Sequence, residues 1–216
     1  MRLPWKGDGN AGGETGGLGL DSIRFDTLGL IMQPDTAPNE REWRGTNLVL
    51  SEHWFPIPPD LPSLQVDELR TTYEEALMGP PQIGGRTPRL LHLAVHRELP
   101  LPAVCTLIRL VPPRGHGFFF AGAITLPLAE SSWVIRALSS EGQLTGVREA
   151  LAGARFLREH RLQGASAEEL LSGLDPYEAK WDLDENDPLT LVRHSISRIL
   201  SSLEIDPRAL YEPSFA

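Results

Sequence analysis

Four strand-like runs in the middle of the chain place the strongest constraint on its fold. In the first run Leu91, Leu93 and Val95 share one side of an extended chain, which is the two-residue period of a half-buried strand. Pro and Gly residues fill the breaks between the runs. The breaks are too short for crossover helices, which favours an antiparallel meander. The runs are residues 89–98, 103–111, 117–128 and 132–139.

Helical patterns flank the meander. Apolar residues recur at three- and four-residue spacing over 63–79, before the meander, and over 145–164, after it. Two further extended segments, at 22–33 and 46–55, precede the first of these helices. We therefore predict an α+β fold, in which an antiparallel meander sheet is packed by two helices and followed by a C-terminal helical extension.

The C-terminal part contains two more helix signals. Ser166 and Glu169 match a capping box, which predicts a short helix ending near residue 173. Asp187 can cap the last helix, and Pro188 suits its first position. The apolar stripe of this last helix consists of Leu189, Val192, Ile196, Ile199, Leu200 and Leu203.

The chain divides into three parts by composition. Residues 1–20 are predicted to be a disordered leader, because seven glycines in the first 19 positions leave too little apolar surface to fix the backbone. The length of 216 residues suits one folded domain, which we place at 21–164. Residues 165–216 are then expected to form an acidic loop and the C-terminal helix.

Composition argues against several classes of protein. No stretch approaches the roughly 20 apolar residues of a membrane span, and no signal-peptide run occurs near the start, so we expect a cytoplasmic protein. Cys105 is the only cysteine, which rules out an intramolecular disulfide and a cysteine-based zinc cluster within one chain. The net charge of −9 argues against binding nucleic acid.

Two motifs resemble cofactor or metal sites, but each lacks a required part. The first three glycines match G-x-G-x-x-G, but no strand precedes Gly7 and no helix follows. Asp182, Asp184 and Asn186 match the start of a calcium loop, yet Arg193 stands where a bidentate Glu is required. We predict no cofactor and no metal ion.

Catalytic signatures are also missing. Residues four apart on a strand lie about 13 Å from each other, so His92 and His96 cannot directly share one metal ion. No G-x-S-x-G or S-x-x-K motif occurs, and Cys105 lies in an apolar run that predicts a buried thiol. We assign no catalytic residue. The alternative is a small hydrolase in which His53, His92, His96 or His116 meets a carboxylate only in three dimensions.

The acidity is concentrated between residues 165 and 188, where eight acidic residues face one lysine. Two large aromatic residues lie within this segment, and together with the negative charge they could anchor a protein partner that has a basic surface. The predicted binding residues are Tyr177, Trp181, Asp182, Asp184 and Glu185. The competing interpretation is that the two aromatic rings fold back onto the core.

The order of elements resembles the PsbP/Mog-like fold. Strands, the helix at 66–77, the meander and a packing helix at 145–160 follow one another as in that group, over about residues 22–162. The stretches FFFAGAITLPL, SWVIRAL and GVREAL, which begin at residues 118, 132 and 146, also resemble uncharacterised bacterial proteins. This resemblance implies binding more often than catalysis, and it transfers no functional residue.

We therefore predict an interaction protein of bacterial type, such as an adaptor, an effector chaperone or an immunity protein. The hydrolase described above is one alternative. A component of a structural assembly, which self-associates through the stripe of the last helix, is another. That stripe could equally dock on the chain's own sheet, and the sequence leaves the oligomeric state open.

Overall fold

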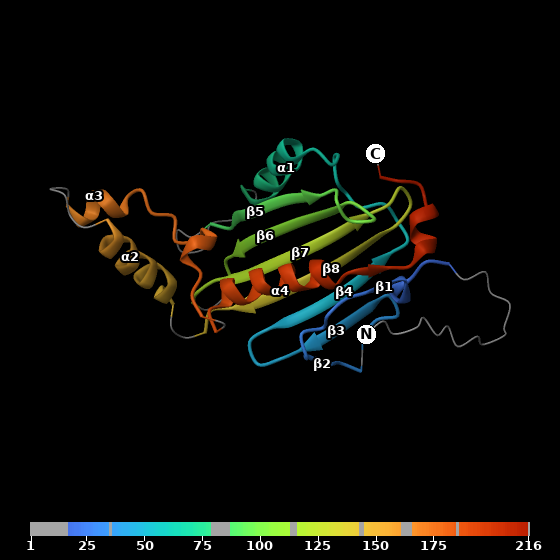
Figure 1. Ribbon diagram of the computed structural model, residues 1–216, viewed down its shortest axis with the longest axis horizontal. Helices are drawn as coiled ribbons and strands as arrows, with labels where there is room; N and C mark the ends of the chain where they lie inside the picture. The colour runs from blue at the N-terminus through green and yellow to red at the C-terminus, as the bar shows by residue number, and fades with distance from the viewer. Residues whose placement is uncertain are drawn as a thin grey trace.

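A seven-stranded antiparallel sheet forms the centre of the computed structural model (Figure 1). The structure describes residues 17–34, 36–78, 87–112, 116–142, 145–160, 166–184 and 186–215. The strands are β2 (Ile31–Met32), β3 (Glu40–Arg44), β4 (Val49–Phe55), β5 (Arg89–His96), β6 (Ala103–Leu110), β7 (Phe119–Pro127) and β8 (Ser132–Ser140). Their order across the sheet is β2-β3-β4-β8-β7-β6-β5. The predicted meander is confirmed, since β5 to β8 are sequential neighbours.

The N-terminal part of the sheet differs from the prediction. The run at 22–33 splits into the short helix η1 (Leu20–Ser22), β1 (Ile23–Arg24) and β2, because Leu28 and Gly29 adopt left-handed φ values of 62° and 70°. We did not predict β3. Trp43 is its one buried residue, so the strand shows no apolar alternation. A separate pair joins β1 to β9 (Glu204–Ile205).

Helices α3 (Ala167–Leu171) and α4 (Pro188–Ser202) begin where local signals place them. The capping box of Ser166 and Glu169 is present, and Asp187 caps the last helix by accepting a hydrogen bond from the Thr190 amide. Of the predicted leader at 1–20, residues 1–16 lie outside the described residues, and Leu20 begins η1. The helices are α1 (Val66–Met78), α2 (Val147–Glu159), α3 (Ala167–Leu171) and α4 (Pro188–Ser202), with the short 3-10 helices η2 (Ala179–Trp181) and η3 (Pro207–Tyr211).

Helices α1 and α4 lie on opposite faces of the sheet. Val104 belongs to the apolar cluster beneath α1, whereas its neighbour Cys105 belongs to the cluster beneath α4. Adjacent residues of a strand point to opposite faces, so the two helices cover the two sides. The predicted α+β class with an antiparallel sheet is thereby confirmed.

One packing helix is not the one we expected. Helix α4 lies across β7 and β8, whereas α2 pairs with α3 in an arm that projects beyond the end of the sheet (Figure 1). The prediction that residues 145–160 pack on the sheet is therefore wrong. Both helices are amphipathic, and amphipathicity alone does not say which one the sheet accepts. The domain boundary at 164 stays a prediction.

The close approach of α4 depends on Gly122 in β7. A Cβ atom at this position would lie 2.6 Å from Cγ1 of Ile196 and 2.9 Å from Cγ1 of Val192. The missing side chain lets α4 sit directly on the strand. Leu189, Val192 and Ile199 are consequently fully buried.

Candidate functional site

The aromatic residues of the acidic segment are buried. Tyr177 is 7% exposed and lies beside the Phe120 ring, and Trp181 is 3% exposed with its ring edge-on to Phe156. Tyr177 therefore lies against the core, as in the competing interpretation, whereas Trp181 is buried against α2 of the arm. Asp184 is exposed, and Glu185 lies outside the described residues. Binding of a partner through this segment stays a prediction.

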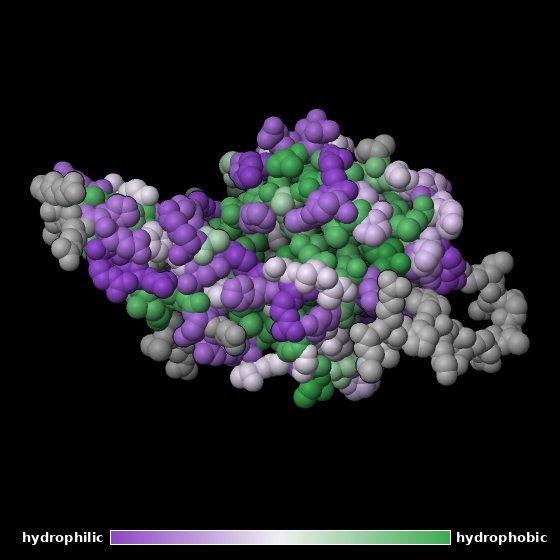
Figure 2. All heavy atoms as spheres, in the orientation of Figure 1, coloured by the Kyte–Doolittle hydropathy of each residue, from purple (hydrophilic) through white to green (hydrophobic). Residues whose placement is uncertain are grey.

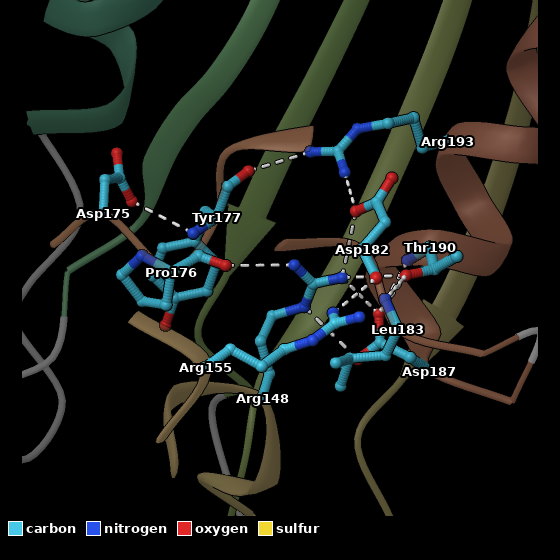
Figure 3. A network of polar contacts seen from close by, with 10 residues as sticks. All are labelled: Arg148, Arg155, Asp175, Pro176, Tyr177, Asp182, Leu183, Asp187, Thr190 and Arg193. Carbon is cyan, nitrogen blue, oxygen red and sulfur yellow. Dashed lines mark hydrogen bonds and ion pairs between the residues drawn. The ribbon is translucent and has the colours of Figure 1, made fainter. Parts of the chain in front are cut away.

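Arg148, in the first turn of α2, joins the arm to the rest of the molecule (Figure 3). Its guanidinium group donates to Asp187 at 2.5 Å, to Asp182 at 3.2 Å, to Thr190 Oγ1 at 2.9 Å and to the Pro176 carbonyl at 3.0 Å. The Arg148 side chain is 2% exposed. A buried cation needs such partners, so this cluster is built to hold α2, the 175–187 segment and the start of α4 together.

The Asp187 carboxylate of this cluster is held in the charged form. Burial opposes ionisation of Asp187, but hydrogen bonds from Arg148 and Thr190 outweigh it and leave the Asp187 pKa below its usual value. Arg193 in α4 donates to Asp182 and, at 2.8 Å, to the Tyr177 carbonyl. The network is therefore a pre-organised support.

Half of the acidic residues of the segment have ion pairs within the fold. Four of its acidic residues have ion pairs: Asp175 with Arg89, Glu178 with Lys180, Asp182 with Arg148 and Arg193, and Asp187 with Arg148. Three of these four bases are distant in sequence, which a local count of charge does not reveal. The described residues contain no group of three or more His, Cys, Asp or Glu that could hold a metal ion.

A hollow of about 570 Å³ lies at the base of the arm, and we call it the junction groove. Three apolar side chains line it and remain open to solvent: Leu138 of β8 is 37% exposed, Val147 of α2 is 45% and Leu151 of α2 is 46%. The end of β8, the β3–β4 turn and the residues before α4 form its other walls. Figure 2 shows a mostly hydrophilic arm with a hydrophobic area over α2.

The ionisable groups of the junction groove are mainly acidic. Glu141, Asp184 and Asp187 line it with Arg148, and Arg148 is already paired with Asp187 and Asp182. Burial, and then the neighbouring Glu149, raise the Glu141 pKa above its usual value. The groove therefore presents an apolar floor with negatively charged groups on its walls.

The histidines of the hydrolase alternative do not meet in this groove. His53 lies 3.8 Å from Glu40 across the β3–β4 pair, and His96 lies 2.7 Å from the exposed Glu98. His92 and His116 are both exposed. No histidine or cysteine is among the residues that line the groove. Burial raises the Cys105 pKa to about 12, as an unreactive thiol requires.

The surface through which the assembly alternative would bind a second copy is not available. The stripe of the last helix, which was to bind a second copy, is buried on the chain's own sheet at Leu189, Val192 and Ile199. Among the described residues, no helix is long and apolar enough to cross a membrane.

Sequence reasoning identified the groove residues without recognising the groove. Val147 and Leu151 belong to the apolar stripe that predicted α2, and Leu138 lies at the end of a predicted strand. We expected these side chains to be buried. A sheet has two faces to cover, and the sequence predicts one amphipathic helix more than these two faces need. This extra helix is the signal that could have indicated a groove.

Comparison with solved structures confirms a Mog1-like α+β fold. The chain is similar to the Ran-binding protein Mog1p of Saccharomyces cerevisiae, with a TM-score of 0.50 at 12% identity over 92% of this chain and 97% of that one. A mutant of the protein Mog1 gives a TM-score of 0.51 at 11% identity, over 88% and 94% of the two chains. No protein-family model matches the chain, and no curated protein matches it in sequence.

Proposed function

We propose that this is a protein-binding protein whose partner places a segment in the junction groove. Within this class we propose a cytoplasmic adaptor, effector chaperone or immunity protein of bacterial type. The main contact surface is then the junction groove, and not the acidic segment that the sequence indicated. Asp184, which was predicted as a binding residue of the acidic segment, lines the groove.

One observation supports the proposal above the others: three exposed apolar side chains meet in a single concave site. Leu138 comes from β8, and Val147 and Leu151 come from α2, the next element along the chain. Scattered apolar residues are normal on a surface, but clustered ones within a polar rim are typical of interfaces.

The support beneath the groove favours binding as well. Arg148 lines the groove and also forms the buried ion pairs with Asp182 and Asp187. These contacts fix the angle of α2, so a partner does not have to order this surface when it binds.

The fold is compatible with this class. Mog1p, which has the same fold, is described as a Ran-binding protein. Fold-level analogy is a weak functional warrant, so the proposal rests on the groove.

The test compares partner capture by full-length variants. Leu138→Ser with Leu151→Ser removes the apolar floor, and Ile31→Ser with Met32→Ser is the control, because these two residues of β2 are also apolar and exposed, at 74% and 57%. We expect proteins that wild type and the β2 control both retain from a native lysate, and that the groove variant loses. Equal capture by all three proteins would overturn the proposal. Circular dichroism melts verify that both variants fold.

A further inference from the structure

We propose that the segment that docks in the junction groove is both apolar and basic, with at least one Lys or Arg side chain that neutralises Glu141 and Asp184. This inference rests on the proposed function and names the chemistry of the partner. It is carried by the charges on the groove walls.

The negative charges of the groove are uncompensated. Among the described ionisable residues that line it, the one base is Arg148, whose side chain is 2% exposed and already bound to two carboxylates. Glu141 accepts a hydrogen bond from the Phe118 amide, and Asp184 accepts one from the Asn186 amide. Neither of these carboxylates has an ion pair within the described residues, so both can accept a partner's cation.

The nearest bases on the arm do not change this balance. Arg155, one helical turn beyond Leu151, donates to the Asp182 carbonyl and does not line the groove. An apolar side chain of the partner would contact Leu138 and Leu151, and a neighbouring basic side chain would reach the acidic wall. Opposite charges placed in this way select the partner and its orientation.

Binding of a cation should also change the protonation of Glu141. Burial raises its pKa, Glu149 and Asp187 raise it further, and the Phe118 amide and Arg109 oppose them. A cation from the partner favours the ionised form, so its binding lowers the Glu141 pKa. A purely apolar ligand would not have this effect.

A random 16-residue peptide library, panned against the full chain, tests the inference without knowledge of the natural partner. Peptides are kept only if they bind wild type and not the Leu138→Ser, Leu151→Ser variant. We expect the retained peptides to combine Lys or Arg with large apolar residues. Their affinity should fall about 5- to 20-fold in Glu141→Gln with Asp184→Asn, since two partly shielded charge pairs are lost.

The control removes two charges elsewhere. Asp67→Asn with Glu75→Gln changes exposed acids of α1, keeps the same net charge as the groove variant, and should leave affinity within about twofold. The amide variants at 141 and 184 keep an oxygen that accepts the same backbone hydrogen bonds, so they should fold.

The outcomes separate the two proposals. If retained peptides are neutral or acidic, or if they bind the Glu141→Gln, Asp184→Asn variant as well as wild type, the basic partner is wrong while the groove stands. If no peptide distinguishes wild type from the Leu138→Ser, Leu151→Ser variant, the proposed function itself is overturned.

Discussion

Helices α2 and α4 are both amphipathic, but only α4 packs its apolar stripe against the sheet. Helix α4 buries its stripe on the sheet, with Leu189 and Ile199 inaccessible. Helix α2 turns its small residues inward, where a Cβ atom added to Gly153 would lie 3.4 Å from the Leu171 side chain of α3, and it leaves Leu151 nearly half exposed. The same periodicity thus produces a core element in one place and an open surface in the other.

The largest effect is expected where the two helices are joined. Arg148→Ala leaves Asp187 buried without its cation, and loss of one partner of a buried ion pair costs about 3 to 5 kcal/mol. Urea denaturation measures this free energy of unfolding. Arg155→Ala, on the same helix but exposed, is the matched control and should change it by less than about 0.5 kcal/mol. Equal losses would mean that the Arg148 contacts do not hold the arm.

The buried stripe of α4 should be the next most sensitive site. Ile199→Ala removes a fully buried side chain and is expected to cost about 2 to 4 kcal/mol in urea denaturation. A cost below about 1 kcal/mol would show that α4 packs on the sheet no more firmly than α2 does.

A third prediction concerns Glu52, which lies on the same face of the sheet as α4 but in a part of that face that η1 covers. Burial raises the Glu52 pKa to about 7, although Arg41 lies 3.6 Å from its carboxylate. The folded protein therefore binds this proton more tightly than the unfolded chain does, and loses stability as pH rises through about 7. Glu52→Gln should match wild type at pH 5 and exceed it by about 2 kcal/mol at pH 8. If the free energies of unfolding of Glu52→Gln and wild type differed by the same amount at pH 5 and at pH 8, the raised pKa of a buried Glu52 would be contradicted.

The smallest effect is expected at the open stripe of α2. Leu151→Ala removes side-chain surface that is already in contact with water, so the free energy of unfolding should change by less than about 0.5 kcal/mol. A loss comparable to that of Ile199→Ala would mean that Leu151 is part of the core and not of a groove.

Local patterns were enough to predict most of the elements. The apolar run at 89–98 predicted β5, and the side chains of Ser166 and Asp187 predicted the starts of two helices, because these signals involve residues close in sequence. The predicted alternation is interrupted by a register shift between Leu90 and His92, which places Leu91 against the cluster beneath α4 and Leu93 in the cluster beneath α1. The charged strand β3 escaped prediction because Trp43 alone is buried.

Properties that depend on distant residues could not be predicted. The choice of α4 as the covering helix depends on the match between Gly122 and Ile196, which are 74 positions apart. The acidic segment looked like an open charged surface because Arg89 and Arg148 come from other elements. The groove depends on the position of α2 after folding, so its residues were identified but not its existence.

Asp187 is the N-cap of α4 and also the partner of Arg148 in the groove wall. A ligand that presses on α2 therefore acts on the carboxylate that holds the Thr190 amide at 2.8 Å. Occupancy of the groove should consequently be readable several residues away, as a change in the hydrogen-exchange rate of the first turn of α4.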